Sequence, residues 1–172
     1  RFTRFANLYV ASLYTGQTVL QLSQLNWSNY AGPFGAGLAL GNHILVWRDG
    51  ASQGPLVARD LASGTSWVVA ERGGLFPDID GDTVAWWELS AANDAPATAV
   101  LKTRRLAPDA APAAEQLRLN LAHAYDLRSS QLGDGWAAWV LAGAEPASLA
   151  LASPDTPYSK MLCSIDSSIF GP

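Results

Sequence analysis

The chain has 172 residues, 49% of them hydrophobic and 15% charged, whereas a typical soluble domain has about 25% charged residues. This composition indicates a packed globular protein rather than a disordered tail, and the formal net charge of −4 argues against nucleic acid as a partner. No apolar run of about 18 residues or more occurs, so we predict no membrane-spanning segment. Cys163 is the one cysteine, which excludes an internal disulfide and a cysteine-rich metal site.

The first predicted element is a β-hairpin over Asn7–Leu22, whose sequence NLYVASLYTGQTVLQL places Gly16 at the turn between two apolar runs. The chain begins at Arg1 rather than at Met, and the residues ahead of the hairpin lack the apolar core of a signal peptide. We therefore expect a partial repeat over residues 1–27, in a chain that is a mature product or a fragment.

The second predicted repeat covers residues 28–70. It contains a turn followed by an apolar strand, GNHILVW, which runs from Gly41 to Trp47. A hairpin of the same kind as the first follows at Gly54–Val69, GPLVARDLASGTSWVV, with Gly64 at its turn. The two motifs together predict four short strands.

The third predicted repeat covers residues 71–120 and has the same order of motifs. The turn and strand, GDTVAWW, run from Gly81 to Trp87, and a looser hairpin follows at Thr98–Leu119. Pro108 takes the place of glycine at its turn, because proline sets in advance the φ that a turn needs.

One segment of this repeat, Ala110–Ala122, is rich in the helix-forming residues Ala, Glu, Gln and Leu. Pro112 interrupts its start, and the repeat requires a turn and a strand at this place. We predict strand rather than helix here.

The fourth predicted repeat covers residues 121–164. Its turn and strand, GDGWAAW, run from Gly133 to Trp139, and its hairpin is expected at Ala147–Cys163. Residues 165–172 match the segment that precedes the turn in earlier repeats, so they predict the start of a further copy.

The two motifs alternate along the chain with a common period. The turn motif recurs after 40 and 52 residues, and the hairpin motif after 48, 44 and 49 residues. Strands such as Ile44–Trp47 are apolar without alternation, which indicates burial on both faces. We predict an all-β fold of β-propeller blades, built from four-stranded antiparallel repeats of about 40–52 residues, in an incomplete ring of about three and a half blades.

The order of motifs resembles the TolB-like β-propeller repeats of secreted bacterial and archaeal cell-surface proteins. The resemblance rests on copies such as FPDIDGDTVAWW, over Phe76–Trp87, and AGPFGAGLALGNHILVW, over Ala31–Trp47, each followed by a hairpin. It covers nearly the whole chain, except that Ser130-Gln131-Leu132 replaces the proline-containing segment in the fourth predicted repeat. The resemblance implies a propeller at an extracellular, cell-surface or periplasmic location, and it implies little about function because the motifs serve packing.

Residues suited to catalysis or metal binding are few. The run Asp78-Ile79-Asp80-Gly81-Asp82 resembles the start of a calcium loop, but Thr83 and Leu89 stand where such a loop needs Gly and Glu. His43 and His123 have no carboxylate or cysteine at ligand spacing. We predict a protein that is not an enzyme and that binds neither a cofactor nor a metal.

Five of the seven tryptophans lie in the strand of the turn motif, which we call the tryptophan strand: Trp47, Trp86, Trp87, Trp136 and Trp139. Aromatic residues outside this strand are the predicted contact residues. Trp27 and Tyr30 lie in an expected loop, and Trp67 lies in a hairpin strand. The favoured interpretation is a protein–protein contact or self-assembly with other copies, as a filament or a multi-chain ring. The alternatives are a carbohydrate-binding accessory domain that uses these aromatics on a glycan, and the gating propeller of a larger hydrolase.

Overall fold

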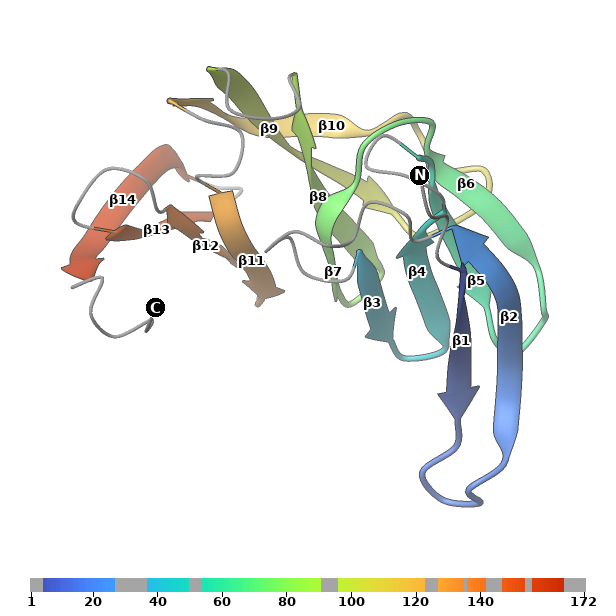
Figure 1. Ribbon diagram of the computed structural model, residues 1–172. Coiled ribbons are helices and arrows are strands. Elements are labelled where there is room, and N and C mark those ends of the chain that lie inside the picture. The colour runs from blue at the N-terminus through green and yellow to red at the C-terminus, as the bar shows by residue number, and fades with distance from the viewer. Residues whose placement is uncertain are drawn as a thin grey trace.

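The computed structural model describes residues 5–26, 37–49, 54–90, 96–122, 127–134, 136–141, 147–153 and 156–165. Within these ranges the structure is built of β-strands joined by turns (Figure 1). Among the described residues there is no helix long and apolar enough to cross a bilayer.

The strands form one two-stranded and three four-stranded sheets, all antiparallel and each made of consecutive strands. The first sheet contains β1 (Phe5–Ala11) and β2 (Thr18–Asn26), and the second contains β3 (Leu38–Gly41), β4 (Ile44–Arg48), β5 (Leu56–Asp60) and β6 (Ser66–Ala70). The third contains β7 (Leu75–Asp80), β8 (Thr83–Leu89), β9 (Ala97–Arg105) and β10 (Ala114–Leu121). The fourth contains β11 (Leu127–Gly133), β12 (Trp136–Leu141), β13 (Ala147–Ser153) and β14 (Thr156–Ile165).

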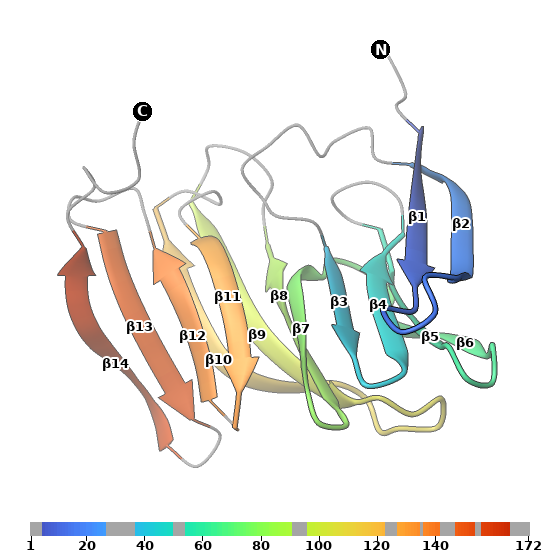
Figure 2. The same ribbon diagram turned by 90° about the horizontal axis from the view of Figure 1, so that it is seen from below.

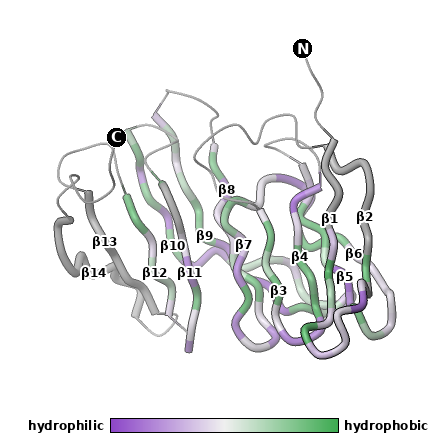
Figure 3. The backbone as a smooth tube through the Cα atoms, turned by 60° about the horizontal axis from the view of Figure 1, so that its bottom comes forward, coloured by the Kyte–Doolittle hydropathy of each residue, from purple (hydrophilic) through white to green (hydrophobic). Residues whose placement is uncertain are grey.

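The sheets stand side by side in a row, face against face (Figure 2). The first strands of the full sheets are neighbours, β3 beside β7 and β7 beside β11, so these strands form the inner side of the row. Hydrophobic residues predominate along the strands, and hydrophilic ones gather at several of the turns (Figure 3). This is the arrangement of propeller blades, and it confirms the predicted fold class.

The segment expected to be strand rather than helix is a strand, since β10 runs over Ala114–Leu121. The limits set for the repeats at residues 27, 70, 120 and 164 stay predictions.

Two turns show that the hairpin motif is a true structural repeat. In the turn after β1, the Ser12 amide donates to the Gln17 carbonyl at 2.9 Å, and Gly16 has a φ of 70°. In the turn after β5, the Asp60 amide donates to the Thr65 carbonyl at 2.9 Å, and a glycine again has positive φ, 74°. Glycine takes this position because a side chain disfavours positive φ.

The turn motif aligns differently from the sequence expectation. Gly41 pairs with Ile44 and Gly133 pairs with Trp136, whereas in the third sheet Asp80 pairs with Thr83 and Gly81 lies within the turn itself. The first residue of each two-residue turn has positive φ, namely Asn42 at 50°, Gly81 at 58° and Asp134 at 49°. The structural equivalent of Gly41 and Gly133 is therefore Asp80, and the alignment on glycine is one residue out in the third sheet.

The same shift applies to the tryptophans. Trp47 and Trp139 lie three residues after the start of their strands, and so does Trp86, while Trp87 is one residue further on. All five tryptophans of the predicted strand do lie in β4, β8 and β12. Because neighbouring side chains on a strand point to opposite faces, Trp86 and Trp87 pack on opposite sides of the third sheet.

Candidate protein-contact faces

Each full sheet has two faces, which we name by their neighbours in the row. The N-side face packs against the preceding sheet and the C-side face packs against the following one. On β4, β8 and β12 the equivalent tryptophans Trp47, Trp86 and Trp139 all lie on the N-side face, because each belongs to a core cluster shared with the preceding sheet.

The best-filled contact joins the third and fourth sheets. Trp87 on the C-side face of the third sheet meets Trp139 on the N-side face of the fourth, with ring centroids 5.6 Å apart and planes at 64°. Both rings are fully buried. An edge-to-face pair of this kind adds about 0.5–1.5 kcal/mol beyond the burial of its area.

Polar bonds also fix the sheets relative to one another. The Asp78 carboxylate on β7 accepts the backbone amide of Leu132 on β11, at 2.7 Å. Arg104 on β9 donates to the Val69 carbonyl on β6 at 2.7 Å and to the Val68 carbonyl at 3.1 Å. Each bond crosses from one sheet to the next, so the row is held by specific contacts as well as by apolar packing.

Charged residues pair at the turns along one edge of the row. His43, the second turn residue between β3 and β4, lies 3.8 Å from Asp60 at the end of β5. In the equivalent pair of the third sheet the carboxylate is in the turn, with Asp82 2.9 Å from Arg105 at the end of β9. In both sheets the contact joins the turn between the first two strands to the end of the third strand.

One of these carboxylates is held ionised mainly by the backbone. The Ala62 amide donates to Asp60 at 2.8 Å and lowers the pKa of Asp60, with smaller contributions from Ser63 and His43. On β10 the Arg118 guanidinium, 2.8 Å away, lowers the pKa of Glu115. Both effects belong to surface turns and strands, and neither marks a reactive group.

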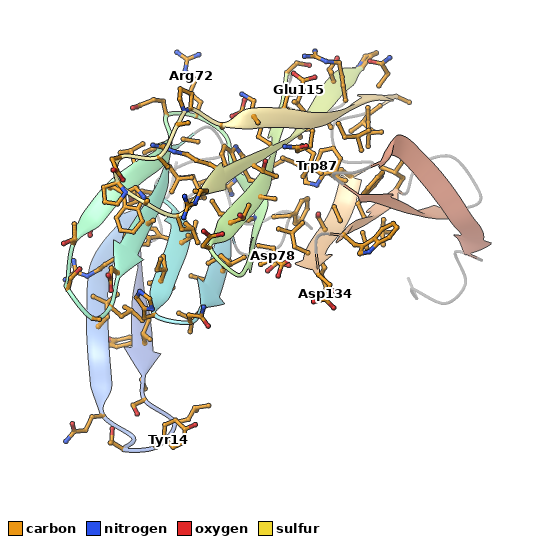
Figure 4. All side chains as sticks on the ribbon, turned by 180° about the vertical axis from the view of Figure 1, so that it is seen from behind. Tyr14, Arg72, Asp78, Trp87, Glu115 and Asp134 are labelled. Atoms are coloured by element: carbon orange, nitrogen blue, oxygen red, sulfur yellow. The ribbon has the colours of Figure 1, made fainter. Side chains whose placement is uncertain are left out.

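Four of the six exposed large apolar residues of the described part lie on the first or the last sheet of the row or on the turn after β1. On the first sheet and the turn that follows β1, Tyr9 is 55% exposed, Leu13 is 99% exposed and Tyr14 is fully exposed. Trp136 on the fourth sheet is 50% exposed. Figure 4 shows Tyr14 at the tip of its hairpin, far from the other labelled side chains. Leu40 on β3 and Val68 on β6 complete the set.

The predicted contact residues are placed as follows. Trp27 and Tyr30 lie outside the described residues, as does His123. Trp67 is half-buried on β6 and packs against the core between the second and third sheets, and its indole nitrogen is buried. Its role in a ligand contact stays a prediction.

Sequence reasoning did not single out Leu13 or Tyr14. The structure places Leu61 and Leu106 at the position of Leu13 in the next two sheets, because the Leu61 and Leu106 amides donate to the second turn residues His43 and Asp82. The sequence period of 44 residues leads from Leu61 to Arg105 instead, so Leu61 was the one signal that the hairpin repeat offered. Leu106 is buried in the core between the second and third sheets, and Leu61 packs against the core between the first and second. The same leucine position is therefore packed against a core in the second and third sheets and exposed to solvent in the first.

A shallow hollow of about 240 Å³ lies beside the β9–β10 connection, lined in part by Arg104, Arg105 and Pro112. Its two guanidinium groups are already engaged, Arg105 with Asp82 and Arg104 with backbone carbonyls. In the described ranges no group of three or more His, Cys, Asp or Glu side chains could hold a metal ion.

No protein-family model matches the sequence, and no curated protein gives a match. The fold is similar to a solved structure titled "Crystal structure of Nidogen/Laminin Complex", with a TM-score of 0.52 and 14% sequence identity. The likeness covers 95% of this chain and 60% of that one, so the chain spans less than two thirds of its length. At this level of identity the likeness shows the fold alone, a row of stacked four-stranded propeller blades.

Proposed function

We propose that the chain is a non-catalytic propeller segment that contacts protein through its exposed apolar side chains. The observation that carries the proposal is the position of the exposed apolar side chains. Leu13 and Tyr14 lie at one end and Trp136 at the other. Exposed apolar groups gathered in this way are typical of protein contact sites, and aromatic residues contribute most to such contacts.

The polar residues that resemble parts of a reactive or metal site have structural partners instead. Asp78, from the acidic run that resembles a calcium loop, accepts the backbone amides of Ile79 and Leu132. Asp82 pairs with Arg105, and His43 pairs with Asp60. These contacts support a scaffold role, in which the row of blades holds its end faces in a fixed geometry.

The solved structure of similar fold is, by its title, a complex of nidogen with laminin. Binding of another protein is the property that we carry over to this chain. The order of motifs around Gly41 and Gly81 supports assignment to TolB-like propellers, and with it an exported or cell-surface location. Among the described contacts, none favours a glycan ligand or a gating role in a hydrolase.

Photo-cross-linking from the exposed hairpin tests this function. A benzoylphenylalanine at position 14 replaces Tyr14 in the chain expressed in its native cells, and the matched control carries it at Ala62, the equivalent position in the next hairpin. We expect protein adducts from position 14 that are several-fold more abundant than those from position 62. Equal yields at the two positions, or no protein adduct from position 14, would contradict the proposal.

A further inference from the structure

We draw no further inference here: the strongest candidate, the shallow hollow of about 240 Å³ beside the β9–β10 connection, carries nothing, because Arg105 pairs with Asp82, Arg104 donates to backbone carbonyls, and nothing in the described part of the chain shows what would occupy it.

Discussion

Gly41 and Gly133 occupy the same position in two hairpins, yet they have different surroundings. A Cβ atom at Gly41 would lie 2.5 Å from Cγ2 of Ile79, on the neighbouring inner strand, while a Cβ atom at Gly133 would have no atom within 4 Å. The backbone of β3 therefore approaches β7 so closely that the contact leaves no room for a methyl group. Gly41 therefore serves packing between blades rather than the turn itself.

This difference predicts the effect of two alanine substitutions. Gly41→Ala should lower the free energy of unfolding by about 1–3 kcal/mol, as overpacking of a core does. Gly133→Ala should change it by less than about 0.5 kcal/mol, as a surface substitution does. Urea denaturation followed by tryptophan fluorescence measures both, and equal effects would show that β3 and β7 are not in this close contact.

Asp60 predicts a dependence of stability on pH. Its pKa is lowered in the folded chain, chiefly by the Ala62 amide, so its ionised form stabilises the fold at pH above its unfolded value of about 3.9. That contribution is lost as the pH falls through the folded pKa. Ser12 makes the equivalent turn with a neutral hydroxyl, which accepts the amides of Tyr14 and Thr15.

Asp60→Ser should therefore keep the turn and remove this contribution. We expect the variant to lose less stability than the unsubstituted chain when the pH is lowered from 5 to 2. Urea denaturation midpoints at several pH values measure the loss, and a carboxyl NMR titration gives the pKa directly. Identical acid losses in the two proteins would show that Asp60 is not held ionised by its turn.

At the scale of the element, two adjacent arginines have different roles. Arg104 points from β9 to the neighbouring sheet and donates to the carbonyls of Val68, Val69 and Ala110. Arg105 pairs with Asp82 on the surface, where the two side chains are 75% and 66% exposed. Sequence alone presents the two arginines as an equivalent basic pair.

Substitution of each arginine by methionine tests this assignment. Arg104→Met should destabilise the fold by about 1–3 kcal/mol, because partly buried carbonyls lose their donors. Arg105→Met should cost less than about 1 kcal/mol, because an exposed ion pair is screened by solvent. Thermal unfolding of the two variants side by side provides the measurement. A larger loss for Arg105→Met would contradict the bridge between the second and third sheets.

Sequence reasoning predicted the strands well and the register of one sheet poorly. The offset of 48 residues between the first two hairpins agrees with their shared hydrogen bonds, because a turn that needs positive φ restricts the residues that can fill it. Gly81 misled the alignment, since a glycine can occupy the turn or end the strand before it. Gly41, Gly81 and Gly133 each precede a tryptophan by six residues, namely Trp47, Trp87 and Trp139. This spacing therefore does not distinguish a glycine within the turn from a glycine that ends the strand.

The candidate site was harder to predict than the fold. The sequence drew attention to aromatic residues, of which Trp67 packs partly inside the row. Leu13 has no distinctive neighbours in the sequence, and its importance emerges only when its exposure is compared with that of Leu61 and Leu106. The exposure of Leu13 depends on which sheets pack against one another, and a local sequence motif does not contain that information.

At the scale of the whole molecule, contacts between neighbouring faces hold the sheets in their order along the row. Each internal face is buried against another sheet, with Trp87 and Trp139 in direct contact and Asp78 and Arg104 bridging between sheets. A row held in this way keeps the exposed Leu13, Tyr14 and Trp136 in fixed positions, which suits a scaffold that contacts other protein.

Photo-cross-linking from position 14 tests this account most directly. Protein adducts from position 14 should be several-fold more abundant than those from position 62, because the surface around Tyr14 carries exposed apolar side chains. Equal yields at the two positions in the folded chain, or no protein adduct from position 14, would contradict the claim that this surface contacts protein.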